Sequence, residues 1–181
     1  MRKNLLALVF LVGGITSTYS QKWKVSSAEV EFRSEAPLEL IIASTQNVKG
    51  VLDFDKRQFA FIIPVSSFDG FNSPLQREHF NENYLETGKY PNAKFYGNIV
   101  GEFDANSNGD YEVKAIGTFD IHGVIQNREI KSIISVTSKG INISSSFLIP
   151  LEDHNIKIPT IVYQKIAEVI KVEMRAELTP I

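Results

Sequence analysis

The amino-acid sequence predicts an all-β protein, an antiparallel barrel of about eight strands with one short inserted helix. Two observations support this fold class. Apolar and polar residues alternate in most segments between residues 23 and 178, which is the period of a strand with one buried face. Only Pro74–Phe95 departs plainly from this alternation. One-sided alternation over many antiparallel strands fits either a sandwich or a closed barrel, and about eight strands can enclose one small ligand.

The first third of the chain predicts three or four short strands. Residues 23–32 begin as a strand, and residues 38–43 are expected to resume it after a break at Pro37. Residues 48–54 then alternate, and residues 59–63 follow after a short turn. Two alternating segments separated by so few residues predict a hairpin.

The segment Pro74–Glu86 is predicted to form one amphipathic helix. Ser73 can cap its N-terminus, Pro74 suits the first helical turn, and Gly88 provides a C-terminal stop. Its apolar residues are Leu75, Phe80, Tyr84 and Leu85. Phe68 and Phe71 lie in the loop before it. A lone helix must bury its apolar stripe, so we expect it to pack on the open end or the interior of the barrel.

The second half of the chain alternates more regularly. Strands are predicted over residues 93–103, 111–119, 130–136, 141–149 and 166–178, with turns at residues 106–110, at His122-Gly123 and at Lys139-Gly140. Several inward positions are small, namely Gly97, Gly101, Ala115, Gly117, Ser145 and Ala176. Small residues there indicate an unfilled apolar cavity, or else the glycines mark bends that curve the barrel.

Residues 1–20 have the pattern of a secretory signal peptide, with cleavage expected near Ser20. Arg2 and Lys3 precede an apolar run at Leu5–Val12, which is far shorter than the roughly 20 residues of a membrane span. Residues 21–181 then form a single domain. The sequence contains no cysteine, which excludes disulfides, cysteine ligands to metals and thiol catalysis.

The charge of the chain argues against some partners. The net charge is −2, and it becomes −4 when the two basic residues of the signal segment are removed. A mildly acidic surface does not favour nucleic acid or an anionic membrane as the main partner.

The residues that could carry catalysis or bind metal are sparse. His79, His122 and His154 are far apart in the sequence and match no metal-binding spacing, so we expect no metal or cofactor. The cluster Glu152-Asp153-His154 contains acid and base types, but no oriented nucleophile accompanies it. An enzyme that acts on a small apolar substrate with this loop is therefore kept as an alternative to a binding protein.

Three sequence blocks resemble the signature of the YceI-like family. They are Arg77-Glu78, YPNAKF at Tyr90–Phe95 and FDIHG at Phe119–Gly123, and they occur in the family's order. A Trp near the start, a glycine-containing strand entry at Lys49–Leu52 and the pair Ile158-Pro159 extend the resemblance over the chain after residue 20. The resemblance implies a periplasmic, lipocalin-like barrel that binds an isoprenoid or another long-chain lipid.

We therefore predict a periplasmic or secreted protein, not an enzyme, whose partner is a long-chain lipid or isoprenoid and for which a homodimer is a possible assembly. Residues predicted to line the ligand site are Phe54, Phe61, Phe68, Phe71, Leu75, Arg77, Phe80, Tyr84, Phe95, Gly97, Ile99, Phe119, Phe147 and Ile170. Arg77 and Lys94 are the candidates for contact with a charged head group. A structural, stress-protective barrel with a filled core is a third interpretation.

Overall fold

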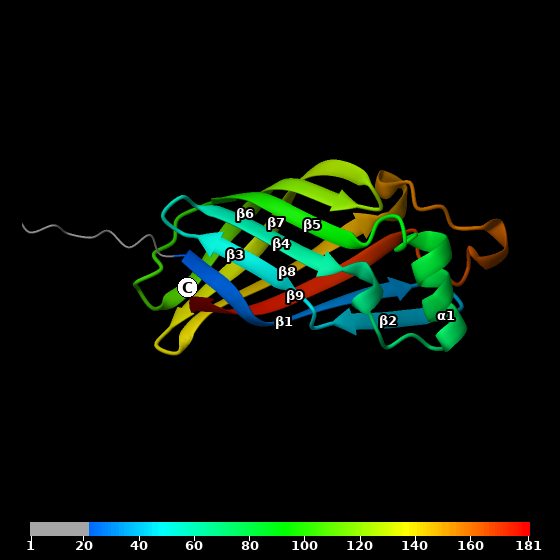
Figure 1. The fold of residues 1–181 in the computed structure, drawn as a ribbon, viewed down its shortest axis with the longest axis horizontal. Helices are drawn as coiled ribbons and strands as arrows, with labels where there is room; N and C mark the ends of the chain where they lie inside the picture. The colour runs from blue at the N-terminus through cyan, green and yellow to red at the C-terminus, as the bar shows by residue number, and fades with distance from the viewer. Residues whose placement is uncertain (1–21) are drawn as a thin grey trace, which may run out of the picture.

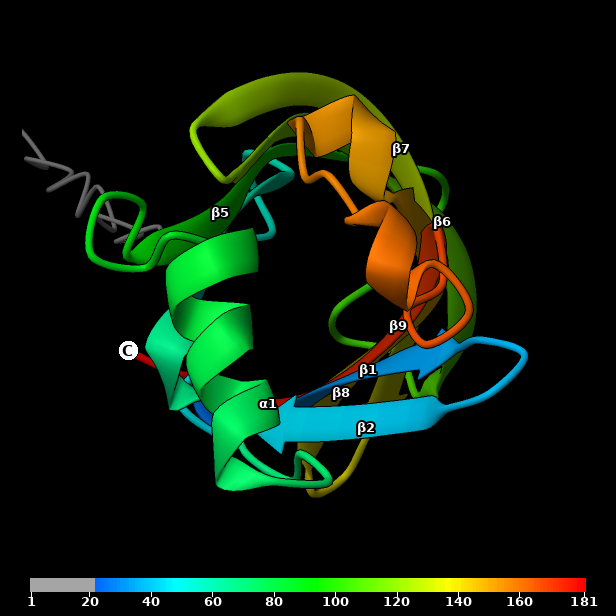
Figure 2. The ribbon, with the colours of Figure 1, turned by 90° about the vertical axis from the view of Figure 1, so that its right-hand side faces the viewer.

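The computed structural model describes residues 22–181, so the predicted signal peptide lies outside the described residues. Nine strands form one antiparallel sheet that closes on itself (Figures 1 and 2). They are β1 (Lys22–Glu35), β2 (Leu40–Thr45), β3 (Lys49–Asp53), β4 (Gln58–Pro64), β5 (Asn92–Val100), β6 (Gly109–Ile121), β7 (Val124–Thr137), β8 (Gly140–Pro150) and β9 (Val169–Pro180).

The long strand β1 closes the barrel. One edge of β1 pairs with β9 from Trp23 to Arg33, and the other edge pairs first with β3 and then with β2. Eight strands therefore form the closed ring, and β2 is an extra strand beside it. The all-β antiparallel barrel predicted from the sequence is confirmed.

The prediction that residues 38–43 resume the first strand is wrong. A turn at Ala36–Glu39, in which the two residues exchange backbone hydrogen bonds of 3.0 and 3.3 Å, reverses the chain. Strand β2 then runs back along β1, with Glu35 opposite Leu40 and Val30 opposite Thr45. Pro37 breaks the strand as expected, but the break is a hairpin and not a bend.

The predicted helix begins at Pro74 as expected, and its last helical turn ends at Tyr84, two residues before the predicted end at Glu86. Helix α1 (Pro74–His79) is capped by the Ser73 hydroxyl, which accepts from the Gln76 amide at 3.1 Å. It continues as a π-helical turn, η2 (Phe80–Tyr84), and the backbone becomes left-handed at Glu86, where φ is 42°. Gly88 is therefore not the residue that ends the helix.

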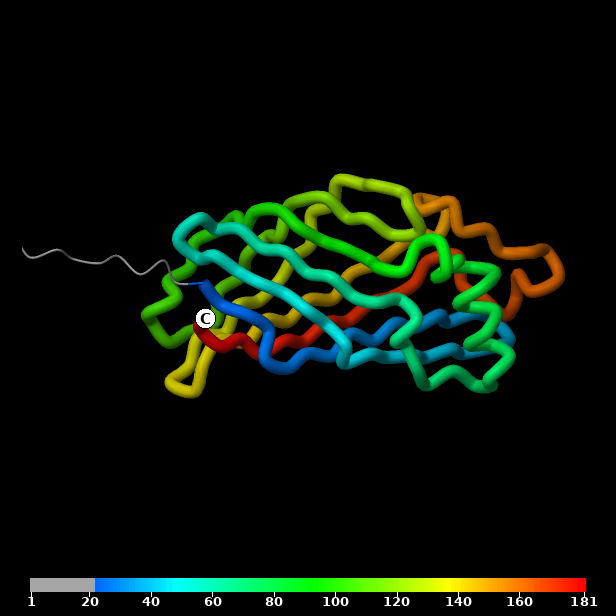
Figure 3. Tube along the Cα trace, in the orientation of Figure 1, coloured from blue at the N-terminus to red at the C-terminus, as the bar shows by residue number. Residues whose placement is uncertain are grey.

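The two ends of the barrel differ. At one end, here called the mouth, lie α1, η2 and the short 3₁₀ helices η3 (Leu151–His154) and η4 (Thr160–Val162) (Figures 1 and 3). The other end, here called the closed end, is filled by aromatic rings. The Phe54 ring lies 6.1 Å from that of Trp23 and 5.3 Å from that of Phe103.

Gly97 on β5 and Gly117 on β6 lie directly opposite each other. This close contact between strands accounts for the two glycines, and the predicted cavity does not. Gly97 pairs with Gly117, and a Cβ at Gly97 would lie 2.2 Å from the Ile116 carbonyl oxygen and 2.6 Å from the Gly117 Cα. A Cβ at Gly117 would meet the backbone of β5 in the same way. The glycines thus permit the two strands to approach closely, and they do not leave space in the lumen.

Candidate functional site

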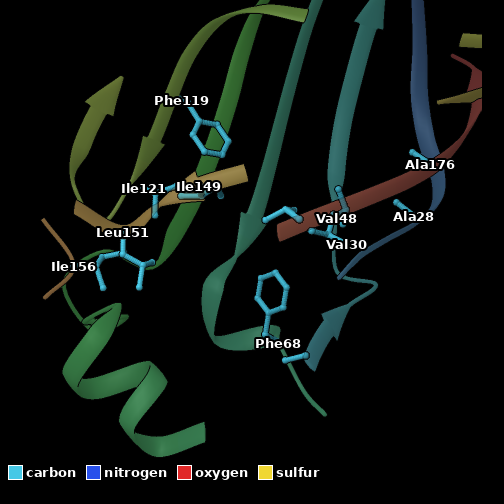
Figure 4. Packing of buried hydrophobic residues seen from close by; sticks show 12 residues of the cluster. Ala28, Val30, Val48, Phe68, Phe119, Ile121, Ile149, Leu151, Ile156 and Ala176 are labelled. Atoms are coloured by element: carbon cyan, nitrogen blue, oxygen red, sulfur yellow. The ribbon is translucent and has the colours of Figure 1, made fainter. Parts of the chain in front are cut away.

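The interior of the barrel is hollow in its mouth half. A cavity of about 470 Å³ extends from α1, η2 and η4 down to a floor in the middle of the barrel. The floor residues are Leu52, Phe59, Ile99, Val113, Ile134 and Ile143, all of which also belong to the packed core of the closed half. Figure 4 shows Phe119, Ile121 and Ile149 on one wall and Val30 and Phe68 on the facing wall.

Most of the predicted site residues line this cavity. They are Phe61, Phe68, Phe71, Leu75, Phe80, Tyr84, Phe95, Ile99, Phe119, Phe147 and Ile170. Many of them are only half-buried although they point inward, because the hollow leaves part of each side chain uncovered. Burial raises the pKa of the Tyr84 phenol, which keeps this lining group neutral.

Three predicted residues do not line the cavity. Phe54 points inward as its alternation indicates, but it lies in the closed-end core beside Trp23. Gly97 offers no lining side chain and serves strand pairing. Arg77 turns toward the surface, where its guanidinium lies 3.6 Å from the Asp69 carboxylate and donates to the Ser66 carbonyl oxygen at 3.4 Å.

Contacts between phenylalanine rings connect the helical segment α1–η2 to the barrel. Phe80 of η2 stacks on Phe32 of β1, with ring centroids 5.4 Å apart and planes 16° from parallel. Phe68 and Phe71 lie 5.3 and 5.9 Å from the same Phe32 ring. The site prediction omitted Phe32, although its place in the alternation of the first strand already indicated an inward side chain.

A second row of rings crosses the opposite wall. Phe95 lies 4.8 Å from Phe59 and 5.4 Å from Phe119, and Phe119 lies 6.0 Å from Phe147. These rings come from β4, β5, β6 and β8, so the wall is aromatic across half the barrel. Between the two aromatic groups, an apolar chain would touch rings on both sides.

Polar groups occur at two levels of the cavity. Deep in the lumen, the hydroxyls of Ser132 and Ser145 lie 2.7 Å apart and satisfy each other. At the mouth, the lining includes Glu39, Gln76, His79, Lys94 and Lys165. The Glu39 carboxylate accepts from the Gln76 amide at 2.9 Å, and Lys94 lies 3.4 Å from Asp120. The site prediction missed Lys165 because it lies in an irregular segment with no alternation.

Two of the signature blocks meet at the mouth. The turn His122-Gly123 has φ values of 54° and 70°, and Gly123 has no room for a Cβ beside the Tyr90 ring. His122 lies 4.9 Å from the Tyr90 ring, and its Nε2 lies 2.7 Å from the Glu86 carboxylate. The C-terminal end of the helical segment is therefore tied to the β6–β7 turn.

The loop proposed for catalysis does not form an acid–base pair. His154 is fully buried, and its ring centroid lies 5.8 Å from that of Phe119. Neither nitrogen of the His154 ring has a hydrogen-bond partner. Burial lowers its pKa, although backbone groups of Ile121 and Val124 lie close enough to oppose this partly. Asp153 pairs instead with Arg128 at 3.5 Å. The loop thus packs against β7 and β8, and the His154 side chain does not line the cavity.

Within residues 22–181, no three His, Asp or Glu side chains lie close enough to hold a metal ion. In the same residues, no helix has the length and apolarity needed to cross a bilayer.

A family model and several solved structures resemble this chain. A YceI-like domain model matches residues 20–178. A polyisoprenoid-binding domain from Saccharophagus degradans superposes with a TM-score of 0.73 at 16% identity, covering 88% of this chain and 98% of that one. Burkholderia cenocepacia BcnA gives 0.67 at 15% identity and covers 84% and 96%, and the Campylobacter jejuni YceI protein gives 0.55 at 15% identity and covers 100% and 99%. A comparison with curated proteins found no significant match. The chain belongs to the YceI-like family.

Proposed function

We propose that this protein is a periplasmic or secreted binding protein that holds a long-chain apolar lipid, isoprenoid or fatty-acid-like, in the mouth half of its barrel. The observation that carries this proposal is the apolar cavity of about 470 Å³, which falls within the roughly 300–1,000 Å³ of typical ligand sites. The neighbour from Saccharophagus degradans is described as polyisoprenoid-binding, which supports the same ligand class.

The energetics favour a chain over a compact polar ligand. Each CH₂ group that leaves water for this lining contributes about 0.8 kcal/mol. A flexible chain of many such groups can therefore bind tightly without a specific polar contact. This also predicts loose selectivity among chains of similar length.

The head group of the ligand would lie at the mouth. Lys165 lines the cavity there and forms no ion pair with another described residue. Lys94 also lines it but already pairs with Asp120. We therefore assign contact with an anionic head group to Lys165 first and to Lys94 second, in place of Arg77.

A cavity-filling substitution tests the proposal. Ala115 lines the cavity on β6, and Ala60 lies on the exposed outer face of β4. Ala115→Phe should abolish uptake of a fluorescent long-chain fatty acid, because its ring would occupy the space of the chain, whereas Ala60→Phe should leave uptake unchanged. Mass spectrometry of lipids extracted from the protein purified from its own periplasm would identify the natural ligand. Normal uptake by a folded Ala115→Phe variant would contradict the proposal.

A further inference from the structure

Large apolar side chains are exposed around the mouth of the barrel. Ile161 is 92% exposed and Tyr163 is 62% exposed, and both lie on the segment 159–165, here called the tip. Leu38, Leu40 and Leu75 are exposed on the neighbouring β1–β2 hairpin and at the start of α1. Figures 1 and 3 show the tip, in orange, as the part of the chain that projects farthest beyond the barrel at this end.

Hydrogen bonds fix the backbone of the tip. The Leu38 amide donates to the Gln164 carbonyl oxygen at 2.9 Å, and the Ala167 amide donates to the Ser34 hydroxyl at 2.8 Å. Within the tip, Val162 and Lys165 donate to backbone carbonyls at 2.9 and 2.8 Å. The exposed side chains are therefore held outward by a bonded backbone.

The apolar surface of the tip continues into the cavity. Val162 and Ile166 line the cavity, while Ile161 and Tyr163, on either side of Val162, face outward. Figure 2 shows α1 and the tip on opposite sides of the mouth. A molecule that covers Ile161 and Tyr163 would thus lie directly over the entrance to the lumen.

We propose that the tip docks on the surface of a lipid bilayer, so that a lipid moves between bilayer and cavity without crossing water. This inference rests on the proposed lipid-binding function. A bilayer suits the site because its apolar interior would become continuous with the cavity lining. Tyr163 has the amphipathic ring favoured at membrane interfaces. Lys157, two residues before the tip, and Lys165, its last residue, are exposed and can meet lipid phosphates. Exposed apolar residues in the middle of the barrel wall are not next to the cavity entrance. Ile116, for example, lies beside the Lys114–Glu129 ion pair.

The test measures binding of the lipid-free protein to phosphatidylcholine vesicles by co-sedimentation. Ile161→Ser should lower the partition coefficient about tenfold, because one Ile side chain no longer enters the bilayer. Ile181→Ser is the matched control, since Ile181 is 74% exposed at the opposite end of the barrel. The control should change binding by less than about twofold. Equal loss in both variants, or no binding of the wild-type chain, overturns the proposal and assigns the tip to a protein contact.

A transfer experiment separates this proposal from the lipid-binding function itself. A fluorescent fatty acid should leave the wild-type protein at a rate that increases with vesicle concentration, and Ile161→Ser should reduce that increase about tenfold while leaving fatty-acid affinity in solution unchanged. A rate independent of vesicle concentration overturns docking. Failure of the wild-type protein to take up fatty acid from solution overturns the lipid-binding function. It does not affect the docking test, which depends on vesicle binding by the lipid-free protein.

Discussion

The closed half and the mouth half of this barrel share the same strands but use their inward positions differently. In the closed half, inward residues such as Phe54, Ile141 and Leu178 are buried in a filled core and do not border the cavity. In the mouth half, inward residues such as Phe147 and Ile170 are half-buried and face the cavity. Alternation therefore specifies which way a side chain points but not whether it meets another side chain. We therefore expect the closed half to contribute most of the stability and the mouth half to hold the ligand.

The largest expected effect contrasts one residue from each half. Ile141→Ala should lower the free energy of unfolding by about 2–5 kcal/mol, because Ile141 lies in the closed-half core away from the cavity and its loss opens a void there. Phe147→Ala should cost only about 1–2 kcal/mol, because its ring already borders empty space, and it should weaken lipid uptake instead. Urea denaturation and a fluorescent fatty-acid assay measure the two quantities. Equal destabilisation by both variants would show that the mouth half is as important for stability as the closed half.

A second prediction concerns the strand contact that both halves share. Gly97→Ala should lower the free energy of unfolding by about 1–3 kcal/mol, because its Cβ would clash with the backbone of β6. Gly88→Ala is the control, since a Cβ there meets nothing within 4 Å. Thermal unfolding of the two variants should separate them clearly. A Gly97→Ala variant as stable as Gly88→Ala would restore the interpretation of Gly97 as a cavity-lining position.

The smallest effect is a pH dependence from His154 in the mouth half. Its pKa is lowered from 6.5 in the folded protein, so the unfolded chain binds more protons as the pH falls below that value. The free energy of unfolding should therefore decrease from pH 7 to pH 5, by a fraction of the roughly 1.4 kcal/mol per pH unit that is the limit for one proton. The pKa values of Asp104 and Glu173 are also lowered, but from 3.8 and 4.5, so they act mainly at lower pH.

His154→Leu supplies the control for this prediction. The substitution removes the titrating group and keeps an apolar side chain against Phe119. Urea midpoints of the variant should change much less between pH 7 and pH 5 than those of the wild-type protein. The same decrease in both proteins would assign the pH dependence to other groups.

Much of the fold could be predicted because alternation and turn residues are local. The turn at His122-Gly123 and the cap at Ser73 are where the sequence indicated. Errors arose where a partner distant in sequence decides the outcome. Phe54 was correctly expected to point inward, but its depth along the barrel depends on Trp23 and Phe103.

The candidate site shows the same division between local and distant information. Most of the predicted aromatic lining follows from alternation, and these residues do line the cavity. The role of Gly97 could not be inferred because Gly117, twenty residues later in the chain, determines it. The direction of Arg77 depends on Asp69 and Ser66, which the helical pattern does not include. Lys165 lies in a segment without periodicity, so no pattern indicated it.

The pairing of β1 with β9 has a consequence for the order in which the barrel folds. It joins the first described strand to the last, and the Ile181 amide donates to the Lys22 carbonyl oxygen at 2.9 Å. The ring therefore cannot close until the final strand has been synthesised and is free to pair. Contacts between such distant segments form slowly. Until then the aromatic lumen is open on one side, so a nascent chain exposes its apolar lining to the surroundings.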